Sequence, residues 1–449
     1  MIGPGSRSPR AEKSRSPLWL WPAVASVVAF VGALFIVDVD LPASLRWLAW
    51  PGGTESATAL LQTIAGSVIT VTGLTFTLTV VALQLASQQF SPRLLRDFTR
   101  DRVIKAVLAV LLATLVFDTT VLRAIDADEP LPDVALLVTS VLGLAALGAI
   151  LAFITHMTRV LRVDTMMLTV HDETDIAIDT FYPGYGDPGP RSPDELDLDG
   201  ADAMRVAART SGFVRRVDVA GLLSAAREHD VVVSIEARPG DHIVRGTPLA
   251  TVWTAGDGRA PTRQQQVRDA VTAAVVIGYE RTVEQDAAFG FRQLTDIAVK
   301  ALSPGINDPV TAAHAVGHMA DLLVRLTGRR LGPTLHEDAD GTGRVVVPDR
   351  DLPYYLELVC GPVRRYGRSE PTVLIALLRM LRDVASAVRD DAQREDLADQ
   401  VGLIVGEVSE TVAAHDAKQV QAMADRVRQA VDGDITGAYH DRSGETRSI

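Results

Sequence analysis

The sequence has very little cysteine and very little lysine. Cys360 is the single cysteine among 449 residues, which excludes a disulfide within the chain and a metal centre built from several cysteines. No lysine occurs between Lys105 and Lys300, and most basic residues are arginines. The formal net charge of −12 gives no electrostatic reason to expect a nucleic-acid partner.

The sequence also lacks the local motifs of several large enzyme classes. It contains no GxxxxGKS or GxxxxGKT phosphate loop, no GxSxG nucleophile elbow, no HExxH zinc motif and no kinase signature. No other complete catalytic constellation is visible. We therefore predict that the protein is not an enzyme and carries no cofactor.

The first third of the chain contains four long apolar segments. Residues 1–17 are basic and polar and predict a disordered tail. A four-helix membrane domain is predicted for residues 18–162, with spans at about 18–37, 60–87, 103–125 and 132–157. A cleaved signal peptide is the alternative for the first segment, but its apolar run is long and a second span follows it.

The distribution of basic residues predicts the orientation of these spans. Arg93, Arg96 and Arg100 lie between the second and third spans, and Arg159 follows the fourth. The loop IDADEPLPD between the third and fourth spans is acidic. Because cytoplasmic loops are enriched in basic residues, we predict a multi-pass protein of the bacterial inner membrane with both termini in the cytoplasm. The same arginines can also contact anionic lipid heads.

The second span is unusually rich in hydroxyl groups. At about 100° per residue its polar residues form two stripes on nearly opposite sides, of which the second consists of Thr72, Thr75 and Thr79. Such residues either permit close helix packing or face water along a path. Asp118 in the third span, at membrane depth, is either functional, interfacial or paired with Arg123. The predicted pore-lining candidates are Thr63, Ser67, Thr70, Thr77, Gln84, Gln88 and Asp118.

A small β-rich module is predicted for residues 203–258, after a connector and linker at 163–202. The spacing of Gly240, Asp241, Val244, Gly246 and Leu249 resembles half of a biotinyl- or lipoyl-type barrel. The two glycines suit turns that other residues resist. The acceptor lysine of carrier domains is missing, so we interpret the module as a structural or docking barrel.

A helical domain is predicted for residues 259–431, followed by a disordered tail at 432–449. His314 and His318 are four residues apart and could be joined by Asp308 or Asp321, but without a certain third ligand we predict no metal site. Charged residues also gather around two helix ends, where they either clamp a carboxylate or phosphate or form an ion-pair network. These ligand or interface candidates are Arg281, Glu284, Asp286, Arg292, Asp296, Asn307 and Asp308.

Three segments resemble a known family. They are QQFSPRLLRDF after the second span, RTVEQDAAFGFRQLTDIA at 281–298 and KALSPGINDPVTA at 300–312. These motifs are similar to those of the bacterial predicted membrane proteins known as domain of unknown function 2254. The resemblance implies four N-terminal spans and a cytoplasmic remainder. It implies no established activity, ligand or catalytic residue.

The expected fold is therefore an α-helical integral membrane protein with four transmembrane helices and a cytoplasmic α+β part. Two functions are consistent with it. The first is an oligomeric, channel-like protein in the lipid bilayer, in which the second span lines a path for small solutes and the cytoplasmic domain assembles or gates it. The alternative is a non-conducting scaffold or sensor that binds an unknown cytoplasmic partner or small ligand.

Overall fold

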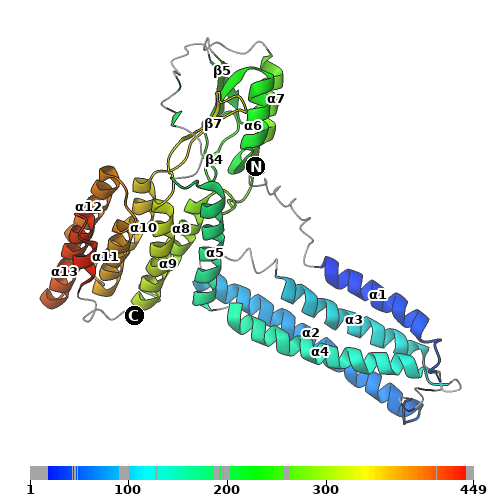
Figure 1. Ribbon diagram of the computed structural model, residues 1–449. Coiled ribbons are helices and arrows are strands. Elements are labelled where there is room, and N and C mark those ends of the chain that lie inside the picture. Colours follow the sequence, from blue (N-terminus) through cyan, green and yellow to red (C-terminus); the bar gives the residue numbers. More distant parts are fainter. Residues whose placement is uncertain are drawn as a thin grey trace. The chain divides into compact units, whose positions relative to one another are not determined.

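The computed structural model divides into two compact units, Met1–Thr165 and Met166–Ile449, called here the N-terminal and C-terminal units (Figure 1). Each unit is described by itself. The predicted tail at 1–17 and most of the QQFSPRLLRDF segment lie outside the described residues. The described residues are 19–42, 44, 47, 49–89, 101–126, 130–160, 162–185, 192, 193, 196, 203–255, 263–410 and 412–440.

The N-terminal unit consists of helices α1 (Leu20–Ile36), α2 (Thr54–Gln89), α3 (Arg102–Ala124) and α4 (Asp133–Val160). In the described part of the unit, α3, α4 and the segment Thr54–Gln84 of α2 are long and apolar enough to cross a membrane. Three of the four predicted spans are thus confirmed as candidate membrane helices. Helix α1 is apolar but has 17 residues, about 25 Å against a bilayer core of roughly 30 Å.

An apolar cluster joins the four helices near the α3–α4 connection. Ala33 of α1, Leu61 of α2, Phe117 of α3 and Leu136 of α4 are all buried in it. At the other end of α3, the Asp101 side chain accepts a hydrogen bond from the Val103 amide at 2.7 Å and thereby caps the helix. Helix α3 packs against α1, α2 and α4 and therefore lies in the middle of the bundle.

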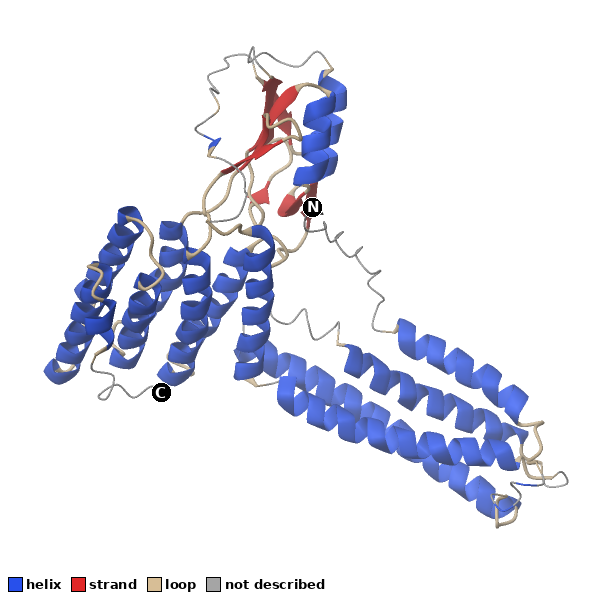
Figure 2. Ribbon diagram, in the orientation of Figure 1, coloured by secondary structure: helices blue, strands red, loops and turns tan. Residues whose placement is uncertain are grey.

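The C-terminal unit contains two small β-sheets, with strand orders β1-β5-β3-β8-β7 and β4-β2-β6. Helices α6 (Val219–Glu228) and α7 (Gln264–Ala274) lie beside the strands (Figure 2), and their buried apolar residues share one core with the strands. The strands are β1 (Met204–Ala207), β2 (Gly212–Val217), β3 (Val231–Ile235), β4 (His242–Ile243), β5 (Pro248–Thr254), β6 (Val275–Gly278), β7 (Thr334–Glu337) and β8 (Gly343–Val347).

Neither sheet closes into a barrel within the described residues, so the lipoyl-like barrel is not confirmed. The reason is that the larger sheet takes β8 from a later part of the chain, where Val345 pairs in parallel with Val233 of β3. The prediction of turns at the two glycines of this module agrees with the structure. Gly240 and Gly246 both adopt φ +90°, a backbone geometry that favours glycine.

The remainder of the C-terminal unit is helical. Helix α11 packs against both α9 and α13, and α8 packs against α9 and α10. Residues 432–449 were predicted as a disordered tail, but this stretch includes a short helix, α14. The Tyr439 ring of this helix lies 4.1 Å from the Arg382 guanidinium. Residues 441–449 lie outside the described part. The helices are α5 (Val163–Phe181), α8 (Ala287–Ala301), α9 (Pro309–Thr327), α10 (Leu352–Gly367), α11 (Pro371–Ala385), α12 (Asp391–Gly406), α13 (Ala414–Val431) and α14 (Ile435–Tyr439).

Candidate functional site

The predicted pore-lining residues of α2 lie on the outer side of the bundle formed by one chain. Thr63, Ser67, Thr70, Thr77 and Gln84 are exposed, while the side chain of Gln88 lies outside the described part. A Cβ added at Gly66 or Gly73 in the same stripe would meet no atom within 4 Å. A single chain therefore encloses no path along this stripe; the stripe faces outward.

The threonine hydroxyls of this stripe bond to their own helix. Thr63 donates to the Ala59 carbonyl at 2.7 Å, Thr70 to the Gly66 carbonyl at 2.8 Å, and Thr77 to the Gly73 carbonyl at 2.9 Å. Each hydroxyl proton is therefore satisfied while its oxygen can still accept a hydrogen bond. The stripe suits both lipid and a water-facing surface.

Asp118 does not lie with these residues. It is fully buried among the helices of one chain, whereas the α2 stripe is exposed. On α2 it is the opposite stripe that turns inward, where Thr75 is 2% exposed. The structure therefore separates the seven predicted pore-lining residues into an outer group on α2 and an inner carboxylate on α3.

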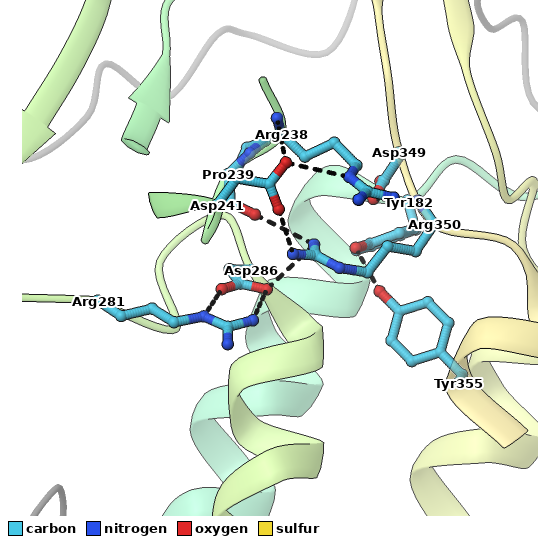
Figure 3. A network of polar contacts seen from close by, with 9 residues as sticks. All are labelled: Tyr182, Arg238, Pro239, Asp241, Arg281, Asp286, Asp349, Arg350 and Tyr355. Atoms are coloured by element: carbon cyan, nitrogen blue, oxygen red, sulfur yellow. Dashed lines mark hydrogen bonds and ion pairs between the residues drawn. The ribbon is translucent and has the colours of Figure 1, made fainter. Parts of the chain in front are cut away.

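In the C-terminal unit, Asp286 lies at the centre of a buried ionic network (Figure 3). It is the N-cap residue of α8, and its carboxylate accepts hydrogen bonds from Arg281 Nε at 2.5 Å and Arg281 Nη2 at 3.1 Å. Arg350 Nη1 lies 3.3 Å from Asp286 Oδ1, the oxygen that also accepts from Arg281 Nη2. The Arg281 guanidinium also stacks 5.1 Å from the Phe289 ring. Two arginines thus share one buried acid.

Arg350 connects the sheets to the helices. It is 3% exposed, and its Nη1 donates to the Pro239 carbonyl at 3.1 Å. Its Nη2 donates to Asp241 at 3.5 Å, and its guanidinium lies 5.2 Å from the Tyr354 ring of α10. Burial lowers the pKa of Arg350, but Asp286 together with Tyr355 and Tyr354 outweighs this effect and raises the pKa above its usual value. The turn 239–241 is held against the start of α8 by this residue.

Two buried tyrosines and a carboxyl group adjoin the network (Figure 3). The hydroxyl oxygens of Tyr182 and Tyr355 are 2.8 Å apart. Burial raises the pKa of Tyr182 well above its usual value, and burial likewise raises the pKa of Tyr355. Burial also raises the pKa of Asp349 to about 6, against the opposing effect of Arg350. This cluster holds protons more tightly than exposed groups of the same kind.

The other predicted ligand candidates do not meet in one site. Glu284 and Asn307 are exposed, and Arg292 and Asp296 are partly buried on α8. Asp308 caps α9, where it accepts hydrogen bonds from the Thr311 hydroxyl at 2.6 Å and the Thr311 amide at 3.0 Å. These hydrogen bonds lower the pKa of Asp308. The turn before α9 therefore serves as a helix cap. Arg281 and Asp286, the two remaining candidates, bind each other in the network described above.

A pocket that the sequence did not predict lies against α9. Its volume is about 440 Å³, and it is lined by residues of α5, α9 and α11. His171 Nε2 lies 3.2 Å from Asp321 Oδ2, and the rings of His171 and His318 are 5.2 Å apart, edge to face. Within the described residues, no group of three His, Cys, Asp or Glu is arranged to hold a metal ion. The polar lining residues include His171, His314, His318, Asp321, Arg379 and Asp383.

Comparison with known proteins identifies the family. The family described as predicted membrane protein, domain of unknown function 2254, matches residues 15–383. Uncharacterized proteins of Mycobacterium tuberculosis (Rv1290c) and Mycobacterium bovis (Mb1321c) are each 32% identical over 395 residues, 86% of this chain and 75% of theirs. No solved structure matches the chain significantly. The resemblance found in the three sequence segments is confirmed, and the chain belongs to this family of predicted membrane proteins.

Proposed function

We propose that the protein is a multi-pass protein of the bacterial inner membrane whose copies assemble with their α2 helices facing one another around a path for small solutes. The observation that carries this proposal is the outward position of the α2 stripe. Thr63, Ser67, Thr70 and Thr77 are exposed on one chain and form a stripe of hydroxyl groups along α2, interrupted by the exposed Leu74. Such a stripe can pack closely against another helix or line a water-filled path.

The chemistry of the stripe suits close approach of several copies. Gly66 and Gly73 leave open space on this face, so a second helix can come near the backbone. The threonine oxygens keep the capacity to accept a hydrogen bond from a solute or water. Helix α2 has 36 residues and is about 54 Å long, so it exceeds the thickness of a bilayer core. The proposed path is polar and uncharged.

The proposed topology has four spans, with α1 as the first. Trp19 and Trp21 at its start are exposed, as are Val28 and Phe35 along it. Exposed tryptophans are typical of the headgroup region, and a short span is accommodated by local thinning of the bilayer. Four spans place both ends of the chain on one side, and Arg159 in the last turn of α4 favours the cytoplasm.

Solute flux in liposomes tests the path. The double variant Thr70→Leu, Thr77→Leu is compared with the wild type for release of small neutral and charged solutes. Thr119→Leu is the matched control, because Thr119 is an exposed threonine of α3 whose hydroxyl donates to its own helix in the same way, to Leu115 at 2.8 Å. We expect the double variant to lose flux and the control to retain it. Equal flux in all three proteins rejects the path.

The pocket on α9 favours a second candidate function, a non-conducting sensor of a small ligand. His171 belongs to α5, and only Leu161 and Arg162 separate α5 from α4. A ligand that contacts His171 and α9 together would therefore act on the segment that continues from the membrane helices. The test is a thermal-shift screen of the full chain with small metabolites. A hit lost in Arg379→Gln but kept in Arg394→Gln, which changes an exposed arginine paired with Asp391, supports this function.

A further inference from the structure

Asp118 has fewer polar neighbours than Asp101 and Asp133, the acidic residues near the ends of α3 and α4. It is fully buried, and neither carboxylate oxygen has a side-chain hydrogen-bond partner among the described residues; the backbone group that acts on it is that of Ala65 on α2. Asp101 caps α3 and pairs with His156, and Asp133 accepts a hydrogen bond from the Trp50 amide at 3.0 Å. Those two acids lie at helix ends, where partners and water are available. Asp118 lies within a candidate membrane helix, six residues before its end.

The neighbours of Asp118 are apolar side chains and hydroxyls. Phe117 and Val121 beside it belong to the buried apolar cluster. Thr114, one turn earlier on the same face of α3, reaches the Leu142 carbonyl of α4 at 3.4 Å. The connection between α3 and α4 makes the two helices antiparallel. Asp118 lies one turn after Thr114 on α3, so it is level with the part of α4 one turn before Leu142, close to Thr139. Thr139 is fully buried, and its hydroxyl has no partner among the described residues.

The charged groups of the four helices do not face Asp118. Helix α1 has none, and Arg123 is exposed and follows Asp118 by five residues, about 140° around the helix. The acid nearest along α4, Asp133, is bonded to Trp50. The charged and titratable groups of these helices otherwise lie near their ends: Glu55 on α2, Arg102 and Lys105 on α3, and His156 and Arg159 on α4.

An unpaired carboxylate is among the least favourable groups to bury in a membrane, and acids found there generally bind an ion or proton. A metal cation needs several oxygen ligands. Asp118 supplies one carboxylate, and within the described residues no group of three His, Cys, Asp or Glu is arranged to hold a metal ion. We propose that Asp118 is a proton-binding site inside the membrane bundle, with the Thr139 hydroxyl as hydrogen-bond partner of the bound acid.

Dicyclohexylcarbodiimide tests this proposal, because it is an apolar reagent that modifies protonated carboxylic acids. The acid proton adds to one carbodiimide nitrogen while the carboxylate oxygen bonds to the central carbon; transfer of the acyl group to nitrogen then gives a stable N-acylurea and consumes nothing else. The full-length protein in liposomes is labelled across a pH series and mapped by mass spectrometry. We expect one adduct in α3, with a yield that falls as the pH rises. It should be absent in Asp118→Asn and retained in Asp133→Asn.

Two outcomes overturn the proposal. The first is the absence of an Asp118 adduct at every pH. The second is protection by sodium ions at constant pH, which would assign the site to a metal cation. The site lies within one chain, so labelling can succeed even where the flux test of the oligomeric path fails.

Discussion

The Asp286 carboxylate and the Arg350 guanidinium are 3.3 Å apart, and 1% and 3% of their side chains are exposed. They join the start of α8 to the segment after β8, which are far apart in the sequence. Removing one partner of such a pair leaves an uncompensated buried charge. The pair therefore fixes how the sheets and helices of the C-terminal unit meet.

The first prediction is that Asp286→Ala destabilises the protein strongly. The variant leaves two arginines without their shared acid, so we expect a loss of about 3–5 kcal/mol of unfolding free energy. Thermal unfolding of the full chain in detergent, followed by tryptophan fluorescence, measures the effect. Glu284→Gln is the control, because Glu284 is exposed two residues earlier and its change should stay within about 0.5 kcal/mol. Equal melting temperatures for the two variants would contradict the role of the network.

The second prediction is that Gly240→Ala is far more harmful than Gly246→Ala. Both glycines have φ +90°, so both variants carry the same backbone strain. A Cβ at Gly240 would also lie 2.0 Å from Asp286 Oδ2 and 2.8 Å from Arg281 Nε, whereas a Cβ at Gly246 meets nothing within 4 Å. The difference between their melting temperatures isolates the close approach of the turn to the network. If both variants unfold at the same temperature, a Cβ at residue 240 has room beside Asp286 and Arg281, and the turn is not in close contact with the network.

The third prediction concerns pH. Burial raises the pKa of Asp349 from 3.8 to about 6. The folded protein therefore holds this proton more tightly than the unfolded chain does, so its contribution to stability is complete below about pH 4 and is lost as the pH rises through about 6. The difference amounts to at most about 3 kcal/mol, since one pKa unit is 1.36 kcal/mol.

Unfolding measured across this pH window tests the effect of Asp349. As the pH rises from about 4 to about 7, the wild type should lose unfolding free energy relative to the Asp349→Asn variant. Contributions of other carboxyl groups, such as Asp308, cancel in this difference. A difference that stays constant with pH would show that Asp349 does not hold its proton in the folded state.

The fourth prediction concerns self-association. Leucine at Gly66 and Gly73 of α2 would fill the open face that the proposed oligomer uses, so we expect the double variant to dissociate into monomers of unchanged helical content. Gly32→Leu is the control, because Gly32 lies on α1 and also has no neighbouring atom within 4 Å of its Cβ position. Mass photometry of the protein in lipid nanodiscs or detergent measures the number of copies. Oligomers that persist in the double variant would move the interface away from α2.

Local patterns predicted what depends on local chemistry. Long apolar runs located α2, α3 and α4, and Gly240 and Gly246 predicted turns, in which both adopt φ +90°. The three sequence segments were enough to identify the family. Each of these features is set by residues that are neighbours in the chain.

Features that join distant segments could not be predicted in this way. Arg350 gives no local sign that it contacts Pro239 and Asp286. Helical periodicity sorted the residues of α2 into stripes, but it cannot say which stripe meets other helices. Asp118 was grouped with Thr70 because of its depth in the third span, although one is fully buried and the other exposed. The His171 side of the α9 pocket was missed because α5 is distant from α9 in the sequence.

The parallel pairing of Val233 with Val345 has a consequence for synthesis of the protein. Strand β3 leaves the ribosome well before β8, and helices α8 and α9 emerge between them. Until β8 arrives, one edge of β3 has no partner, and an exposed strand edge invites pairing with other chains. Any expression clone that stops before residue 343 keeps this edge permanently open, so gene fragments intended for soluble production should extend through Val347.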